Sequence, residues 1–456
     1  MKTAVGNHIS EHLTGAVREL LESLRGYSGA NRDGNRIVRL EVKLPAVDPL
    51  AWLAARSGAG LFYWRDRKGH SEHAAFGCAD ELALAPTDSP DILTRELHSR
   101  FGYEAAMGRY YGGMCFDPKR PLSNDWRPFG TLHLVLPQWE LTRTGEESIL
   151  ACHVAEGNLD AVDEQSSTLA EMADLERMKA NLAISKLQHT PDYEAWQQQL
   201  TRILPTLSAS ELEKLVLDRQ STLIIDRPIQ PWSVLARLRE TMTNTYLFGL
   251  SPQPGYCFLG ASPERLYARR GTTIASEAVA GTRERGHTDV EDTEREAELL
   301  SCDKEKREHG FVARHVADSL HTLCDEVTTD QTTQVVRLPR LMHRIERFRG
   351  RLKSGVDDAD ILTTLHPTPA VAGYPVDKAV GELRQLSPVE RGWYAGPVGW
   401  VAAQAAEFAV GIRSALVTPK RVLFYVGAGI VDGSTAEAEW QELDAKLGSL
   451  LGAFTA

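Results

Sequence analysis

The stretch GPVGWVAAQAAEFAVGIRSALVTPKRVLFYVGAGI, residues 396–430, contains three apolar segments separated by short turns. Their β-branched and aromatic residues predict strands over residues 396–402, 407–416 and 421–426. Helices and hairpins elsewhere in the chain mix without the regular strand–helix–strand rhythm of a doubly wound sheet. We therefore predict an α+β fold with large antiparallel sheets.

Residues 192–456 continue this mixture on both sides of the quoted stretch. Helices are predicted over residues 193–204, 232–241 and 436–451, and strands over residues 215–225, 245–250 and 256–261. A single long helix is predicted over residues 293–324, because five apolar residues keep a helical period. These are Leu299, Leu300, Val312, Val316 and Leu320.

The first part of the chain is richer in strand signals. An amphipathic helix is predicted over residues 11–26, followed by strands over residues 36–44, 60–64 and 131–136. The polar stretch 156–187 favours a helix flanked by loops and would connect the two parts. We divide the chain into residues 1–190 and 191–456, the second of which carries the chemistry.

Composition excludes several functional classes. The formal net charge of -11 disfavours binding to nucleic acid. The six cysteines stand singly without a CxxC pair, which favours a reduced, cytoplasmic protein. No run of eighteen apolar residues predicts a membrane span. No heptad pattern forces a dimer, so a monomer or weak homodimer is expected.

Two pairs of glutamates are candidate metal ligands. Glu305 and Glu308 lie three residues apart on one predicted helix, and Glu439 and Glu442 lie three apart on another. Side chains at this spacing share one helix face, and four converging carboxylates would need a cation such as Mg²⁺. Spacing alone favours solvated helix surface, since Glu442 and Lys446 form an i,i+4 pair.

A lysine and a glutamate are candidates for proton transfer. Lys214, in ELEKLVLDR, enters a half-buried strand where desolvation would favour a general base. Glu264, in FLGASPERL, follows small residues and a proline turn, where a carboxyl group can act as a general acid. The alternatives are an edge-strand lysine that prevents aggregation and a glutamate at a helix start.

The quoted stretch, together with Tyr394 just before it, also contains a candidate anion site. Arg413 lies within a predicted apolar strand and should have an anionic partner, because a buried unpaired guanidinium is costly. Tyr394, Gly427 and Gly429 would complete a carboxylate anchor through a hydroxyl group and exposed backbone amides. A structural ion pair is the equally supported alternative.

These motifs together resemble the chorismate-utilising enzymes, which include isochorismate, salicylate, anthranilate and aminodeoxychorismate synthases. The resemblance extends from about Tyr193 to the C-terminus, and LFYWRD and GGMCFDP extend it more loosely into the first half. The segments that carry it are ELEKLVL, LGASPERL, AVAGT, DKEKREH, LHPTPAVAG, WYAGPVGW, GIRSA and GAGIVDGS.

The resemblance implies one large α+β domain that includes residues 1–190. It also implies Mg²⁺ bound between the glutamate helices and the ring carboxylate of chorismate. Glu305, Glu308, Glu439 and Glu442 match the metal-site positions, with Glu308 and Glu439 expected as direct ligands. The resemblance thus reverses the preference for solvated helix surface.

Catalytic roles follow from the same resemblance. Lys214 matches the base that activates water in isochorismate and salicylate synthases, and Glu264 matches the acid that protonates the departing C4 hydroxyl. The remaining matched positions line the substrate cleft. They are Gly281, Thr282, His343, Tyr394, Arg413, Gly427 and Gly429.

Ala370 bears on the product. Lyase-competent members of the family tend to have Thr at this position, and isochorismate synthases tend to have Ala. The resemblance therefore implies an isochorismate synthase, with a salicylate synthase as the alternative, and leaves menaquinone and siderophore pathways open. Two departures are noted: Asp432 occupies a variable position near the metal helix, and the charged segment 283–296 is interpreted as a solvated loop or a mobile cover.

Overall fold

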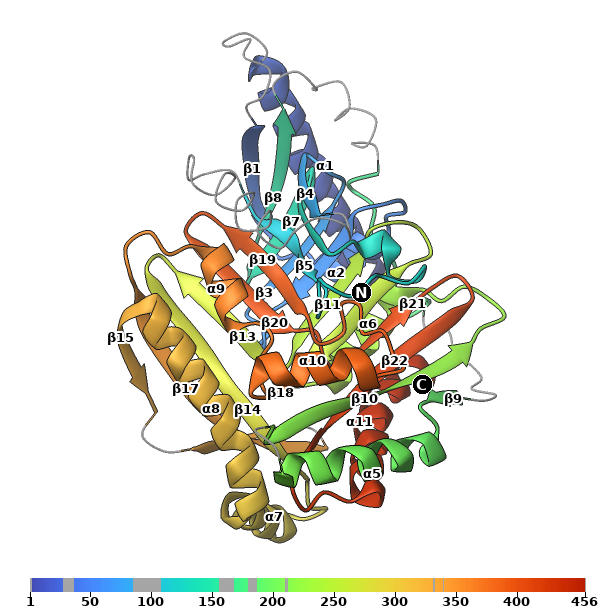
Figure 1. Ribbon diagram of the computed structural model, residues 1–456. Helices are drawn as coiled ribbons and strands as arrows, with labels where there is room; N and C mark the ends of the chain where they lie inside the picture. Colours follow the sequence, from blue (N-terminus) through green and yellow to red (C-terminus); the bar gives the residue numbers. More distant parts are fainter. Residues whose placement is uncertain are drawn as a thin grey trace.

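Two antiparallel sheets form the body of the molecule (Figure 1). The computed structural model describes residues 2–27, 37–84, 108–155, 168–178, 187–209, 212–330, 333–338 and 340–455. The pairings between described strands are antiparallel, and the expected α+β class is confirmed.

The first sheet contains twelve strands from both parts of the chain. Their order is β1 (Ile37–Pro45), β8 (Glu147–Ala155), β7 (Trp139–Thr144), β3 (Ser71–Phe76), β2 (Leu61–Arg65), β11 (Tyr246–Ser251), β12 (Cys257–Ser262), β21 (Ser414–Val417), β22 (Arg421–Ile430), β10 (Lys214–Ile224) and β18 (Gly373–Tyr374), with β9 (Leu187–Thr190) also paired to β10.

The second sheet contains ten strands and also mixes the two parts. Their order is β15 (Cys324–Thr329), β17 (Leu341–Leu352), β14 (Thr273–Glu284), β13 (Arg265–Arg270), β20 (Ala405–Val410), β19 (Pro397–Ala402), β5 (Tyr110–Met114), β6 (Leu132–Leu136) and β4 (Asp80–Leu84), with β16 (Gln334–Arg337) also paired to β17.

The two sheets face each other, and the core lies between them. The rings of Phe62 on β2 and Tyr111 on β5 are 5.3 Å apart, and the Tyr246 hydroxyl on β11 donates to Glu407 on β20 at 3.3 Å. Strands β11 and β12 are buried along their whole length. Such continuous apolar runs are typical of strands that are covered on both faces.

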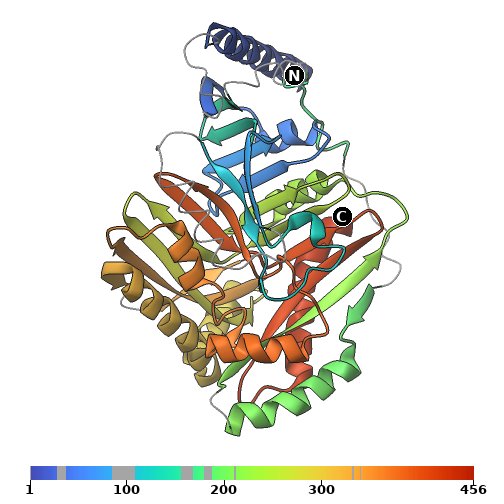
Figure 2. The same ribbon diagram turned by 45° about the horizontal axis from the view of Figure 1, so that its top comes forward.

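Helices cover the outer faces of the sheets (Figures 1 and 2). Helices α2 (Pro49–Ala54), α6 (Pro231–Thr241) and α11 (Ala436–Thr455) pack on the first sheet, and α8 (Asp303–Leu323) packs on the second. The other described helices are α1 (Lys2–Tyr27), α5 (Tyr193–Ala209), α7 (Asp289–Ser301), α9 (Asp358–Leu365) and α10 (Val376–Leu386).

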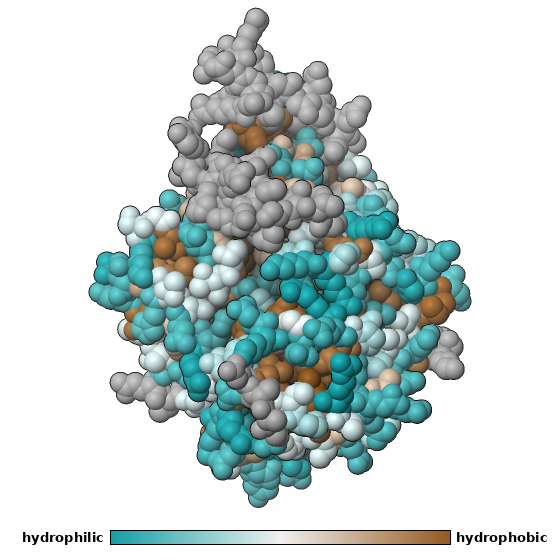
Figure 3. Space-filling view, viewed as in Figure 1, coloured by the Kyte–Doolittle hydropathy of each residue, from teal (hydrophilic) through white to brown (hydrophobic). Residues whose placement is uncertain are grey.

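The described surface is largely polar. The face in Figure 3 is mostly hydrophilic, with hydrophobic residues gathered in small groups. The large hydrophobic side chains that stand exposed are Tyr193, Ile224 and Val290. No described helix is long and apolar enough to cross a membrane.

The predicted long helix over residues 293–324 is wrong in one respect. Cys302 has an extended backbone (φ -64°, ψ 122°), which ends α7 and caps the start of α8. Glu305 and Glu308 therefore lie near the N-terminus of α8, where the helix dipole favours carboxylates. No glycine or proline lies at this break, and the helical period of the apolar residues continues across it. The sequence pattern therefore predicts one helix where the structure has two.

Two further predictions need correction. The segment 283–296 is not a loop, because β14 extends to Glu284 and α7 begins at Asp289, capped by Thr288. Within the stretch 156–187, residues 168–178 form turns instead of a helix. Residues 156–167 and 179–186 lie outside the described part of the chain.

The predicted strand over residues 407–416 is two strands in different sheets. Strand β20 ends at Val410 in the second sheet, and β21 begins at Ser414 in the first. Arg413 lies in the passage between them and has a left-handed backbone, with φ at 51°. The prediction that this arginine lies within a strand is wrong.

A second passage between the sheets contains Glu264. Pro263 and Glu264 join β12 of the first sheet to β13 of the second. The two passages are hydrogen-bonded to each other: the Val410 amide donates to the Glu264 carbonyl at 3.1 Å, and the Ala261 amide donates to the Arg413 carbonyl at 3.0 Å. The candidate acid and the candidate anion anchor are thereby held side by side.

Candidate active site

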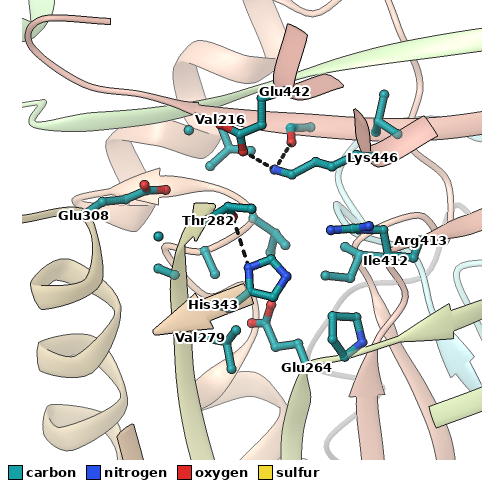
Figure 4. Close-up of a pocket in the computed structure, with 18 of the residues that line it drawn as sticks. Val216, Glu264, Val279, Thr282, Glu308, His343, Ile412, Arg413, Glu442 and Lys446 are labelled. Atoms are coloured by element: carbon teal, nitrogen blue, oxygen red, sulfur yellow. Dashed lines mark hydrogen bonds and ion pairs between the residues drawn. The ribbon is translucent and has the colours of Figure 1, made fainter. Parts of the chain in front are cut away.

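One cavity brings together most of the candidate residues (Figure 4). Lys214, Glu305 and Glu439 do not line it, although each lies beside a residue or strand that does. The candidates that line the cavity are Glu264, Gly281, Thr282, Glu308, His343, Ala370, Tyr394, Arg413, Gly427, Gly429 and Glu442.

Lys214 lies beneath the cavity and forms an ion pair with Glu308. It is the first residue of β10, its side chain is fully buried, and its Nζ is 3.0 Å from Glu308 Oε1. Burial alone would raise the pKa of Glu308, but the charge and hydrogen bond of Lys214, together with the charges of Lys446 and Lys304, lower that pKa. The structure thus places a buried, paired lysine where an edge-strand lysine was the alternative.

Gly429 makes room for this ion pair. It lies opposite Val216 in the β10–β22 pairing, and a Cβ atom on it would be 2.5 Å from Glu308 Oε1 and 2.9 Å from Lys214 Cε. Gly427 similarly leaves space for the Tyr394 hydroxyl, which would be 2.9 Å from an added Cβ. Both glycines therefore leave room for polar side chains at the cavity, where any larger residue would overlap them.

Glu264 is a carboxyl group with an unusually high proton affinity. Burial raises its pKa to about 8, the charge of Lys214 opposes this rise, and the charge of Glu277 adds to it. The group is therefore protonated at neutral pH. It points into the cavity beside His343 (Figure 4).

Arg413 is buried without an ion-pair partner among the described residues. One guanidinium nitrogen donates to Ser449 Oγ at 3.0 Å, and burial lowers the pKa of Arg413 to about 10. The guanidinium lines the cavity and remains cationic at neutral pH. The expected anionic partner is absent from the described protein groups, so the site suits a ligand carboxylate.

His343 is a neutral ring at the centre of the cavity. Its Nδ1 is hydrogen-bonded to Thr282 Oγ1 at 3.0 Å, and its buried Nε2 has no protein partner in the described structure. The pKa of His343 is lowered to about 3, mainly by burial and in addition by the charges of Arg413 and Lys446. This ring is available for a hydrogen bond to a ligand.

The four glutamates lie on α8 and α11 at one end of the cavity. The pKa of Glu305 is raised to about 7, mainly by burial and in addition by the charges of Glu308 and Glu442. The Thr282 amide donates to Glu305 at 3.2 Å. Three of these four carboxylates have a lysine partner in the structure: Glu308 with Lys214, Glu439 with Lys304 at 2.7 Å, and Glu442 with Lys446 at 2.6 Å.

The metal prediction is left untested by this arrangement. No three His, Cys, Asp or Glu side chains in the described ranges are grouped closely enough to hold a metal ion. The mutual repulsion among Glu305, Glu308 and Glu442 nevertheless shows that their charges act on one another. Oxygen donors of this kind fit a hard cation such as Mg²⁺.

Comparison with known proteins identifies the family. Residues 21–455 match the family described as chorismate binding enzymes. The chain belongs to this family. An isochorismate synthase 2 of Arabidopsis thaliana, described as chloroplastic, is 34% identical over 447 residues, which cover 90% of this chain and 79% of that protein. The isochorismate synthase MenF of Escherichia coli is 33% identical and covers 96% of this chain and 98% of its own length.

Solved structures agree with the family. The structure of the menaquinone-specific isochorismate synthase MenF of Escherichia coli superposes with a TM-score of 0.82 at 29% identity, over 96% of this chain and 99% of that one. Anthranilate synthase component I of Streptococcus pneumoniae has a TM-score of 0.61 at 18% identity, over 92% of this chain and 93% of that one. At that identity the likeness concerns the fold of chorismate-binding enzymes alone.

Several residues that line the cavity of this chorismate-binding enzyme were not predicted. Lys446 was interpreted as part of a solvated pair, but its Nζ donates to the Gly427 carbonyl at 2.8 Å and its side chain is 17% exposed. Its position on the same face of α11 as Glu439 and Glu442 was a usable signal. The other unpredicted lining residues are Val216, Pro263, Val279, Ala280, Val371, Ile412, Tyr425 and Val426.

Proposed function

We propose that this chain is an isochorismate synthase that converts chorismate to isochorismate. The observation that carries the proposal is the buried Glu264, whose pKa is raised, in one cavity with the unpaired Arg413 and close to the buried Lys214. Curated relatives at 33–34% identity, over most of both chains, are isochorismate synthases. A salicylate synthase, which would go on to eliminate pyruvate, is the alternative.

The proposed reaction moves the hydroxyl group from C4 to C2. Lys214, which must first lose the proton that it carries in its ion pair with Glu308, removes a proton from water as the water oxygen bonds to C2, and the ring double bonds shift. The bond between C4 and its oxygen breaks, and Glu264 donates its proton to that oxygen. One water molecule enters and one leaves, so the reaction is an isomerisation and needs no oxidant or reductant.

The cavity residues hold the substrate dianion in place. Arg413 binds one carboxylate through charge-assisted hydrogen bonds, and the neutral His343 offers its free Nε2 beside the ring. Tyr394 stacks on Tyr425 at 5.2 Å and closes one side. Fixing the substrate between these groups supplies the orientation that a bimolecular attack by water otherwise lacks.

We further propose that Mg²⁺ is the cofactor, held by Glu308 and Glu439 with Glu305 and Glu442 beside them. When bound there, it would neutralise a substrate carboxylate and compensate the crowded glutamates. The raised pKa of Glu305 supports this proposal, because the charges of Glu308 and Glu442 add to the effect of burial at this end of the cavity.

Removal of the metal tests this assignment. Excess chelator should abolish turnover, and added Mg²⁺ should restore it. Mg²⁺ alone should also raise the unfolding temperature of the wild type, and Glu308→Ala or Glu439→Ala should remove that increase. Full activity in excess chelator, or unchanged stabilisation of both variants, would contradict the assignment.

The product distinguishes the two candidate activities. Ala370 lines the cavity and offers a methyl group where a threonine hydroxyl could orient the ring or a water molecule for further reaction. We therefore expect purified protein with chorismate and Mg²⁺ to approach a reversible equilibrium with isochorismate, without salicylate or pyruvate. Stoichiometric pyruvate together with salicylate would establish the alternative and leave the roles of Lys214 and Glu264 intact.

The cellular setting stays a prediction. The sequence favours a cytoplasmic enzyme that acts alone or as a weak homodimer on a small-molecule substrate. Comparison of sedimentation at low and high protein concentration would test the oligomeric state.

A further inference from the structure

Arg67 extends from the first part of the chain to the passage that carries Glu264. It lies in the turn between β2 and β3, and one guanidinium nitrogen donates to the Pro263 carbonyl at 2.9 Å. The same guanidinium donates two hydrogen bonds to the Glu277 carboxylate on β14, at 3.1 and 2.5 Å. It also lies 5.1 Å from the ring centroid of Tyr246.

Glu277 is buried and shared between two arginines. Its side chain is 2% exposed, and it accepts a further hydrogen bond from Arg265 at 3.2 Å. Arg265 in turn donates to the Tyr246 hydroxyl at 2.8 Å and lies 3.5 Å from Glu407. The resulting network joins strands of both sheets directly behind the passage at Pro263 and Glu264.

Neither Arg67 nor Glu277 lines the cavity. Both nevertheless act on the proton of Glu264. After burial and the charge of Lys214, the groups that change its pKa are Glu277, which raises it, and Thr368 and Arg67, which lower it. The other titratable or charged side chains that line the same cavity are His343 on β17, Tyr394 before β19, Arg413 before β21, Glu308 on α8, and Glu442 and Lys446 on α11.

We infer that Arg67 and Glu277 are positioning residues for the general acid. Arg67 holds the Pro263 carbonyl and thereby fixes where Glu264 points, and Glu277 holds Arg67 while placing a negative charge behind the acid. The inference rests on the proposed function, since it concerns the acid of that reaction. Through Arg67, residues 1–190 would thus help to position Glu264, which belongs to residues 191–456.

The two partners of this ion pair act on the acid with opposite sign, which provides the test. Glu264 must be protonated to donate, so kcat/KM falls as the pH rises through its pKa. Arg67→Gln removes a positive charge and should move this alkaline limb upward, by about 0.5 pH unit or more. Glu277→Gln removes a negative charge and should move the limb downward by a similar amount.

The Arg67→Lys variant tests the position of Glu264 separately from the positive charge at residue 67. Lysine keeps the positive charge but cannot form the forked contact with Glu277 and Pro263 together. Its alkaline limb should stay near that of the wild type, while kcat falls severalfold because the acid is displaced. Arg384→Gln is the matched control, since Arg384 makes a forked pair with Asp117 on the exposed side of α10 and should leave both parameters unchanged.

A purely structural ion pair would behave differently. Breaking it from either side would then lower the unfolding temperature and the yield of active enzyme, and the alkaline limbs of both variants would stay in place or move in the same direction. Either result would overturn the inference. A wild-type enzyme that does not convert chorismate would instead contradict the proposed function, so the two failures are distinguishable.

Discussion

Glu264 is the residue whose protonation decides the pH range of the reaction. Its pKa of about 8 means that the acid form predominates below that pH, so kcat/KM should fall as pH rises through about 8. Glu264→Gln should lower kcat roughly a hundredfold or more and should abolish this limb, because glutamine does not titrate. Steady-state rates from pH 6 to about 10 would measure both effects.

Activity measurements on the Lys214→Ala variant test whether Lys214 and Glu264 act together. If base and acid share one transition state, the combined Lys214→Ala and Glu264→Gln enzyme should lose much less activity than the product of the single losses. Multiplicative losses, or a near-normal kcat for Lys214→Ala, would contradict the pairing. Far-ultraviolet circular dichroism should be unchanged in all three variants.

Sequence patterns identified residues that belong to local motifs and missed those that act across the fold. Lys214, Glu264 and Arg413 each stand in a distinctive short motif, and Glu264 and Arg413 meet in the cavity. Arg67 carries no such signal, because its contacts with Pro263 and Glu277 join positions about two hundred residues apart. Periodicity and capping rules describe neighbours in sequence and cannot report such pairs.

At the scale of elements, the contact between β22 and α8 depends on the absence of one side chain. A Cβ on Gly429 would overlap Glu308 Oε1, so Gly429→Ala should displace Glu308 from Lys214. We expect a severalfold loss of apparent Mg²⁺ affinity, read from the Mg²⁺ dependence of the rate and of the unfolding temperature. The control is Gly448→Ala on α11, where an added Cβ has no neighbour within 4 Å.

Equal Mg²⁺ dependence in the Gly429→Ala variant and the wild type would show that the space above Gly429 does not support the metal site. Loss of stability in Gly448→Ala would instead mean that any added methyl group perturbs this region. Alanine also favours a helix over glycine, so a small stabilisation is the expected result for Gly448→Ala.

Element types were predictable, whereas their interruptions were not. Most predicted strands and helices of residues 193–451 occur near their expected bounds, because strong apolar periodicity fixes them locally. The break at Cys302 and the passage at residues 411–413 depend on tertiary packing. An arginine in left-handed conformation, such as Arg413, has no sequence signal comparable to glycine.

At the scale of the whole molecule, the two parts of the chain share their sheets. Strand β2 lies between β3 and β11, and β5 lies between β6 and β19. A fragment of residues 191–456 would retain every proposed reacting group but would expose the edges of β11 and β19. We expect it to lack cooperative unfolding and activity, as measured by calorimetry and chorismate consumption.

Co-expression of residues 1–190 as a separate chain provides the control, since it restores the missing strands without changing any catalytic residue. An active, cooperatively folded fragment 191–456 would contradict the expectation. The α+β class followed from hairpin spacing and the mixture of elements, but the sharing of both sheets required pairings between distant strands that no local pattern encodes.

The two passages between the sheets also constrain the length of the chain. Only Pro263 and Glu264 separate β12 from β13, and residues 411–413 separate β20 from β21. Successive side chains of a strand point to opposite faces of the sheet. One residue inserted or deleted at either passage would therefore exchange the two faces of the strand that follows. The turn at residues 271–272 joins neighbouring strands of a single sheet and is free of this demand. Insertions and deletions should therefore be tolerated at hairpin turns and excluded where Glu264 and Arg413 stand.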